Sequence, residues 1–290
     1  MGSVGGMADE IVVGVDGSAA ALDAVRWAVG EAVSRKLPLR LVYAADVTGG
    51  RFDAGFPVPQ SYFDELERAG QQLLAEAARA AGTAAVITEM PLEPPASFLL
   101  RLSETARMVV LGSSGRGGFT GMLAGSTAVS VSAHARCPVA VVRGEAHPRG
   151  PVVVGIDGSP TSERALAVAF DEAAWREVSL VAVHAWSDAD YGLPLPAPDV
   201  DWAQVEREQH SLLAQRLAGW RERYPEVRVD RVVVRDRPRD ELLSRSDGAQ
   251  LVVVGSRGRG GFRGLVLGST SQALIHHSRC PVLVVRPHTG

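Results

Sequence analysis

The sequence predicts an α/β protein with two tandem domains, each built on a doubly wound parallel sheet of five strands. Two observations lead to this fold class. The first is an internal duplication: GSSGRGGFTGMLAGST at 112–127 returns as GSRGRGGFRGLVLGST at 255–270, and RCPVAVVR at 136–143 returns as RCPVLVVR at 279–286. The second is the alternation of short β-rich runs with helical patterns in each copy. Repetition at so long a period indicates duplicated domains rather than a solenoid of short repeats.

Each half has the size of one domain. We place the first domain at 9–145 and the second at 150–288, close to the commonest domain length of ~100–150 residues. The 290 residues are 46% hydrophobic and 22% charged with a formal net charge of −3, as in ordinary soluble globular proteins. This composition favours neither a nucleic-acid partner nor a membrane protein, since no run approaches the ~20 apolar residues of a membrane span.

The two cysteines and the N-terminus indicate a cytoplasmic protein. Cys137 and Cys280 occupy the same place in each repeat, between the last helix and the last strand. They form no disulfide framework, which suits a reducing compartment, and we expect small buried residues rather than reactive thiols. The first residues lack the basic and apolar regions of a secretory signal.

The expected strands follow the same order in both halves. In the first half they lie at 11–15, 39–44, 85–89, 108–111 and 139–142. In the second half they lie at 152–156, 180–185, 229–234, 251–254 and 282–285. Near-continuous apolar runs such as VVVG are typical of a parallel sheet that is buried on both faces. Helices between such strands imply right-handed crossovers.

Helical spacing marks the segments between the strands. Leu22, Val25, Val29 and Val33 predict one apolar helix face after the first strand. In the second half a long helix is marked by Trp202, Val205, Leu212, Leu213, Arg216 and Trp220, and it stops before Pro225. The Pro/Gly-rich stretches 49–60 and 191–198 are either lids over a site or variable surface loops.

The glycine-rich loop after the fourth strand predicts an anion site. Gly112, two residues, Gly115, nine residues, Gly125 and Ser126 recur at identical spacing in the second half as Gly255, Gly258, Gly268 and Ser269. Glycines let a ligand approach the backbone, and the start of the next helix offers free N–H groups where the helix dipole is positive. The loop lacks the lysine of a Walker motif and the GxGxxG spacing of a dinucleotide fold.

The loop after the first strand supplies an acidic side chain. Asp16 and Asp157 each precede a Gly-Ser pair, and loops after strands one and four meet at the switch point of a doubly wound sheet. A carboxylate there can accept hydrogen bonds from ribose hydroxyls. Alternatively, Asp16 only fixes a turn, and Ser159 with Pro160 behind it caps the next helix.

These motifs together resemble the universal stress protein family, in its tandem, ATP-binding branch, over essentially the whole chain. The resemblance implies a Rossmann-like fold of the adenine nucleotide α-hydrolase type, with strand order 3-2-1-4-5 and ATP bound in each half, its Mg²⁺ held mainly by the phosphates. It places Asp16 and Asp157 on ribose, with Val15, Ile156, Ala44 and Ala185 around the base. It places the phosphates against Gly112, Gly115, Gly125, Ser126 and Thr127, and against Gly255, Gly258, Gly268, Ser269 and Thr270.

The two glycine loops differ in charge. Where the first carries Ser114, Arg116 and Thr120, the second carries Arg257, Arg259 and Arg263. The two extra positive charges indicate either tighter phosphate binding in the second half or a solvated loop.

Other candidate sites have little support. His276 and His277 lie in the last expected helix without a carboxylate at metal-ligand spacing, and His184 ends a strand whose expected neighbours are apolar. No Ser, His and Asp arrangement for nucleophilic catalysis is legible.

Three classes of function remain. The first is a nucleotide-binding regulator of the stress response that hydrolyses ATP slowly or not at all, with a protein partner that the sequence does not identify. The second is an enzyme of the adenine nucleotide α-hydrolase group, such as an ATP pyrophosphatase or ligase, but VGVDGSAA departs from the SGGxDS-like loop of such enzymes. The third is a nucleotide-free scaffold, against which the intact glycines argue.

The last strand of each half is expected at a sheet edge. An exposed apolar edge is a template for pairing, and single-domain members of the family commonly dimerise through this strand. The resemblance therefore implies that strands 139–142 and 282–285 pair with one another, and it allows a homodimer of the whole chain.

Overall fold

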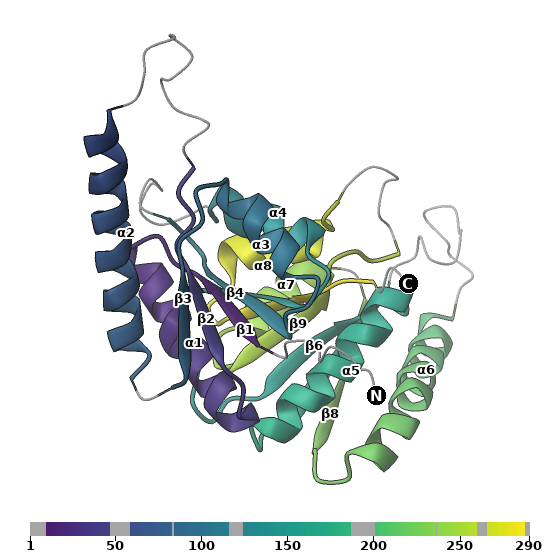
Figure 1. The fold of residues 1–290 in the computed structure, drawn as a ribbon. Helices are drawn as coiled ribbons and strands as arrows, with labels where there is room; N and C mark the ends of the chain where they lie inside the picture. Colours follow the sequence, from purple (N-terminus) through teal and green to yellow (C-terminus); the bar gives the residue numbers. More distant parts are fainter. Residues whose placement is uncertain are drawn as a thin grey trace, which may run out of the picture. The chain divides into compact units, whose positions relative to one another are not determined.

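The computed structural model describes residues 10–46, 59–82, 84–115, 124–186, 201–235, 237–259 and 266–287. The chain forms two compact units, the first reaching to Arg143 and the second comprising Gly144–Pro287. Each unit contains a parallel sheet with helices packed on it (Figure 1).

The first unit has five strands and four helices in its described part. The strands are β1 (Ile11–Gly14), β2 (Leu39–Val42), β3 (Val86–Glu89), β4 (Met108–Gly112) and β5 (Val139–Val142). The helices are α1 (Ala19–Arg35), α2 (Gln60–Ala80), α3 (Pro95–Leu102) and α4 (Ser126–His134). The strand order is β3-β2-β1-β4-β5, and the neighbouring strands pair in parallel.

The second unit repeats this plan. Its strands are β6 (Val152–Ile156), β7 (Leu180–Trp186), β8 (Val229–Arg235), β9 (Leu251–Gly255) and β10 (Val282–Val285). Its helices are α5 (Pro160–Trp175), α6 (Trp202–Arg223), α7 (Pro238–Arg245) and α8 (Ser269–His277). The strand order is β8-β7-β6-β9-β10, with parallel pairs throughout. Both units therefore have the predicted order 3-2-1-4-5.

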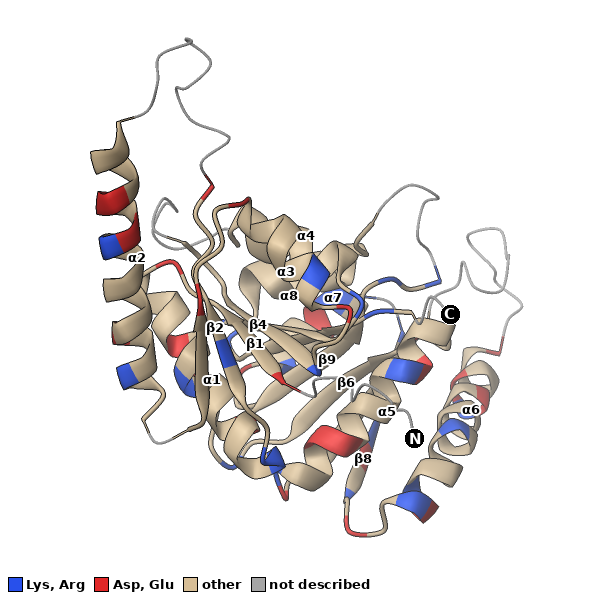
Figure 2. Cartoon of the chain, in the orientation of Figure 1, with Lys and Arg blue, Asp and Glu red and all other residues tan. Residues whose placement is uncertain are grey.

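The central strands are covered on both faces. In the first unit α1 packs against α2, and α3 packs against α4. Because parallel crossovers are right-handed, this strand order places the two helix pairs on opposite faces of the sheet. The central β1 residues Ile11, Val12 and Val13 are consequently inaccessible to solvent. Charged residues of both signs lie along α2 and α6 (Figure 2), which is typical of solvated outer faces.

The apolar face predicted for α1 is partly wrong. Val25 is fully buried, but Val33 is 63% exposed, while Ala24 and Ala28 are completely buried. The helix therefore contacts the sheet mainly through small side chains, a feature that a count of large apolar residues misses.

An aromatic cluster fixes α6 against α5 in the second unit. Phe170 is fully buried, and its ring stacks on Trp220 at 5.9 Å and on Tyr224 at 5.6 Å between centroids. Leu213 and Leu217 of α6 are also fully buried. This packing sets the position of Arg216, which lies on the same helix.

Candidate functional site

The candidate site lies at the carboxyl edge of each sheet, where the loops after the first and fourth strands of a unit meet. In the first unit β1 pairs directly with β4, so both loops leave the sheet side by side. The Ser18 hydroxyl donates to the carbonyl of Ser114 at 3.2 Å and joins the two loops. The Asp16 Oδ1 atom accepts from the backbone N–H of Ser18 at 3.0 Å. Gly17 takes a left-handed conformation with φ +81°, which explains the glycine in this turn.

The acidic residue of the second unit lies in the same arrangement, between the loops after β6 and β9. Asp157 Oδ1 accepts from the Ser159 N–H at 2.9 Å, and Oδ2 accepts from the N–H of Arg259 in the glycine loop at 2.8 Å. One carboxylate thus holds the loop after β6 to the loop after β9. A carboxylate has about four lone-pair positions, so capacity remains for a ligand hydroxyl.

The surroundings of Asp157 keep it ionised. Burial raises the pKa of this carboxyl, but hydrogen bonds from Ser159, Arg259 and Ser162 outweigh burial, and the net pKa is lowered from the ordinary value. A carboxylate in this state accepts hydrogen bonds well and is a weak base.

Ser18 and Ser159 act as helix caps. The Ser18 hydroxyl accepts from the Ala21 N–H at 3.1 Å, and the Ser159 hydroxyl accepts from the Ser162 N–H at 3.2 Å. Pro160 occupies the first helical turn of α5, as the sequence suggested. These serines are explained by the start of α1 and α5.

The first two glycines of each loop touch different neighbours. A Cβ atom at Gly112 would lie 2.6 Å from the carbonyl of Ala20, so this glycine permits close packing of β4 on α1. A Cβ atom at Gly115 would lie 2.7 Å from Asp16 Oδ2, and one at Gly258 would overlap Asp157 Oδ2. Gly115 and Gly258 therefore lie directly against the acidic side chains, whereas Gly255 packs on Thr161 of α5 as Gly112 packs on α1.

The third glycine of each loop begins a helix. Gly125 is the N-cap of α4 and Gly268 the N-cap of α8, and neither helix has a side-chain hydrogen bond at its cap. The Gly125 N–H donates to the Ser113 carbonyl at 2.8 Å, and the Gly268 N–H donates to the Ser256 carbonyl at 2.7 Å. These bonds hold the start of α4 against the residue after β4, and the start of α8 against the residue after β9. The first-turn N–H groups and the helix dipole consequently face the candidate site.

The helix-start hydroxyl residues are accessible in both units. Ser126 and Ser269 are exposed, and Thr127 and Thr270 are half-buried. Their positions match between α4 and α8, so the two units present the same groups at this end of the site.

The residues expected around a base lie on the neighbouring strands. Val15 and Ile156 are buried directly before the acidic residues, and the Val15 N–H donates to the Val42 carbonyl at 2.8 Å. Ala44 lies two residues beyond the end of β2, whereas Ala185 lies within β7, and both are half-buried.

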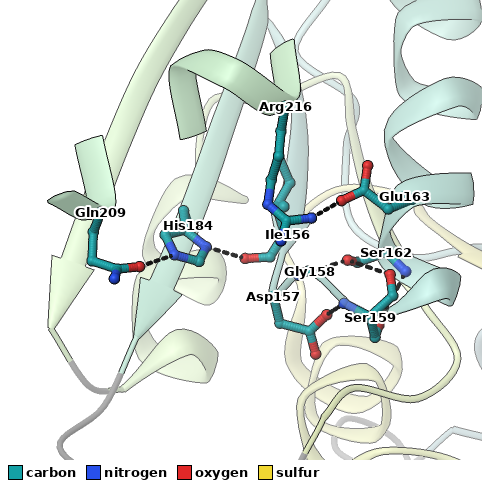
Figure 3. A network of polar contacts seen from close by, with 9 residues as sticks. All are labelled: Ile156, Asp157, Gly158, Ser159, Ser162, Glu163, His184, Gln209 and Arg216. Atoms are coloured by element: carbon teal, nitrogen blue, oxygen red, sulfur yellow. Dashed lines mark hydrogen bonds and ion pairs between the residues drawn. The ribbon is translucent and has the colours of Figure 1, made fainter. Parts of the chain in front are cut away.

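His184 has polar neighbours, contrary to the expectation of apolar ones. It is buried on β7, with Nδ1 at 2.9 Å from the Ile156 carbonyl oxygen and Nε2 at 2.8 Å from Gln209 Oε1 of α6 (Figure 3). His184 therefore connects the end of β6 to α6. Periodicity along β7 could not reveal this partner because Gln209 belongs to a separate element, helix α6.

Some expectations fall on residues that the structure does not describe. Most of the stretch 49–60, all of 191–198, and Arg116, Thr120 and Arg263 lie outside the described ranges. Within those ranges no group of three or more His, Cys, Asp or Glu side chains has the arrangement of a metal site. No helix among the described residues is long and apolar enough to cross a membrane.

Both cysteine thiols are buried, and their surroundings make them unreactive. Burial raises the pKa of Cys137 to about 12 and that of Cys280 to about 11. Because the thiolate is the reactive species, we expect iodoacetamide at pH 8 to leave both thiols unmodified in the native protein and to alkylate both in denaturant. Intact-mass measurement reads out the labelling, and fast native alkylation at either position would contradict this environment.

Comparison with known proteins gives the family. A sequence model of the universal stress protein family matches the chain twice, at residues 7–143 and 148–286. Two universal stress proteins of Mycobacterium tuberculosis strain H37Rv are 44% and 42% identical over 288 residues, each covering 95% of this chain and 96% of the relative. The solved structure of a universal stress protein from Archaeoglobus fulgidus covers 96% of this chain and 98% of its own, with a TM-score of 0.69 at 22% identity, which is a likeness of fold.

The family match spans both units, and the relatives are similar over nearly their whole length. The chain therefore belongs to the universal stress protein family and carries two of its domains in tandem.

Proposed function

We propose that each unit binds one adenine nucleotide, ATP, at the carboxyl edge of its sheet, and that the protein acts as a nucleotide-dependent regulator in stress response. One observation carries the proposal: both units bring an acidic side chain, a glycine in contact with it and a helix start without a side-chain cap to the same place. A carboxylate suits ribose hydroxyls, and backbone N–H groups at a helix start suit phosphates.

The role of each residue in this proposal follows from its position. Asp16 and Asp157 accept hydrogen bonds from ribose, with Val15, Ile156, Ala44 and Ala185 beside the base. Gly115 and Gly258 give the ligand access to the backbone next to these carboxylates. The phosphates lie at Gly125, Ser126 and Thr127 and at Gly268, Ser269 and Thr270, with Gly112 and Gly255 completing each loop. Mg²⁺ would be held mainly by the phosphates. A regulatory protein partner and homodimerisation of the chain belong to the same proposal.

The direct test is the nucleotide content of the freshly purified protein. Mass spectrometry of the released small molecules should detect an adenine nucleotide, and calorimetry of the emptied protein should approach two ATP per chain. Titrations that detect no adenine nucleotide binding to the emptied protein would reject the proposal in favour of a nucleotide-free scaffold.

Turnover is expected to be slow. Asp157 is a weak base because backbone N–H groups lower the pKa of its carboxyl, and phosphoryl transfer needs an oriented nucleophile as well as charge neutralisation. We expect an ATPase rate well below the roughly 1–100 s⁻¹ of kinases. A fast, Mg²⁺-dependent rate that disappears in the Gly258→Glu variant would instead favour an enzyme of the α-hydrolase group.

A further inference from the structure

The two units differ where the long helix after the second strand passes over the candidate site. In the first unit a Cβ atom at Gly17 would touch the side chain of Leu73 on α2. In the second unit a Cβ atom at Gly158, the corresponding glycine, would overlap guanidinium nitrogens of Arg216 on α6 and of Arg259 in the glycine loop. On the helix that follows the second strand, the second unit therefore has the cationic Arg216 where the first unit has the aliphatic Leu73.

An acidic residue accompanies Arg216. Its Nη1 atom forms an ion pair with Glu163 on the first turns of α5 (Figure 3). Glu163 is the fourth residue after the capping Ser159, and the fourth residue after Ser18 in the first unit is Leu22. The first unit thus has leucines, Leu22 and Leu73, at the two positions that form the ion pair in the second.

The ion pair does not engage every hydrogen-bond donor of the Arg216 guanidinium. The Arg216 side chain is 22% exposed, and its Nε is buried without a hydrogen-bond partner among the described residues. The Glu163 side chain is 37% exposed, so this carboxylate can exchange Arg216 for water. An arginine with a spare donor and a partly solvated partner can transfer to a phosphate oxygen, whose geometry suits the guanidinium fork.

Further cationic groups lie at the same edge. Arg257, which replaces Ser114 of the first unit, donates from Nε to the Val266 carbonyl at 3.2 Å. Burial lowers the pKa of Arg286, and the charge of Arg257 lowers it further. Mutual repulsion of this kind is relieved by a bound anion.

We propose that Arg216 is a specificity residue of the second unit, held by Glu163 in the free protein and transferred to the phosphate chain of a bound nucleotide. The second unit then discriminates in favour of nucleotides with more phosphates, whereas the first unit, with Leu22 and Leu73, discriminates less. This inference rests on nucleotide binding by both units, as proposed above.

The test compares ATP with AMP by calorimetry on the full chain, fitted with two sites. For the parent we expect one site to prefer ATP over AMP at least about tenfold more strongly than the other site does. Arg216→Leu should reduce this difference although Arg257 remains, while Arg216→Lys should retain more of it because the charge at position 216 remains. Leucine occurs at the corresponding position of the first unit, and circular dichroism would verify folding.

Glu163→Gln should change the ATP preference in the direction opposite to Arg216→Leu. It releases the guanidinium from its ion pair, so the ATP preference of the second unit should rise severalfold. Glu208→Gln, which makes the same chemical change on the exposed side of α6, is the matched control and should leave both sites unchanged.

The outcomes separate this inference from the proposed function. If both sites bind nucleotides and the ratio of ATP to AMP affinity is equal in parent and Arg216→Leu, the role of Arg216 is overturned and the nucleotide sites stand. A fall in ATP preference in Glu163→Gln would also overturn it. If the parent binds neither nucleotide, the proposed function and this inference fail together.

Discussion

Gly115→Glu and Gly258→Glu should each eliminate one nucleotide site while the chain remains folded. A side chain at either position meets the carboxylate of Asp16 or Asp157, and the introduced glutamate adds a second negative charge beside the phosphates. Neither glycine has a positive φ, so the change acts through contact and charge rather than backbone strain. Calorimetry should show one ATP per chain for each single variant and none for the double variant.

Gly30→Glu is the matched control for this change. Gly30 lies on α1, and a Cβ atom there would meet nothing within 4 Å. The variant should bind two ATP per chain and unfold at a temperature close to that of the parent. If ATP raises the melting temperature of the Gly115→Glu/Gly258→Glu variant as much as that of the parent, these glycines have only a structural role.

Asp16→Ala and Asp157→Ala should weaken their own sites independently. A charge-assisted hydrogen bond contributes about 1.5–3 kcal/mol, so each substitution should lower the affinity of its site roughly 10- to 100-fold. Two-site calorimetry of each single variant tests whether the other site is unaffected. Unchanged affinity at both sites of the Asp16→Ala/Asp157→Ala variant would exclude these carboxylates from ribose binding.

The stability effect of Asp157→Ala should depend on pH. The folded-state pKa of this carboxyl is lowered, so its contribution to stability is present above its unfolded pKa of about 3.9 and is lost as the pH falls through the folded value. The difference in unfolding free energy between parent and variant should therefore be constant near pH 7 and shrink below about pH 4. A difference that stays constant down to pH 2 would show that the charge of Asp157 does not act on the loop.

The sequence predicted the sheet well because its signals are local. Buried parallel strands need continuous apolar runs such as VVVG, and the duplication let each half confirm the other. The acidic and glycine loops could be placed together because strand order determines which loops meet. The buried face of α1 was harder to predict, since Ala24 and Ala28 carry weak hydrophobic signals although they pack completely.

The missed features depend on contacts between distant elements. Arg216 and Glu163 belong to different helices, and the packing of Phe170 against Trp220 and Tyr224 brings these helices together. Likewise, the position of α6 brings Gln209 within hydrogen-bonding distance of His184. Spacing along the chain carries no information about such pairs.

The two units differ in their tryptophan content and therefore in their intrinsic fluorescence. Trp27 is the tryptophan of the first unit, whereas Trp175, Trp186, Trp202 and Trp220 belong to the second. Trp186 directly follows Ala185 on β7, and its ring stacks on Trp202 at 6.1 Å between centroids. Ultraviolet emission from the protein consequently originates mostly in one of two otherwise matching halves. A nucleotide titration followed by tryptophan fluorescence would therefore report mainly on binding to the second unit. Calorimetry of the same sample would measure binding to both units, so the two methods together distinguish the two halves of an unlabelled chain.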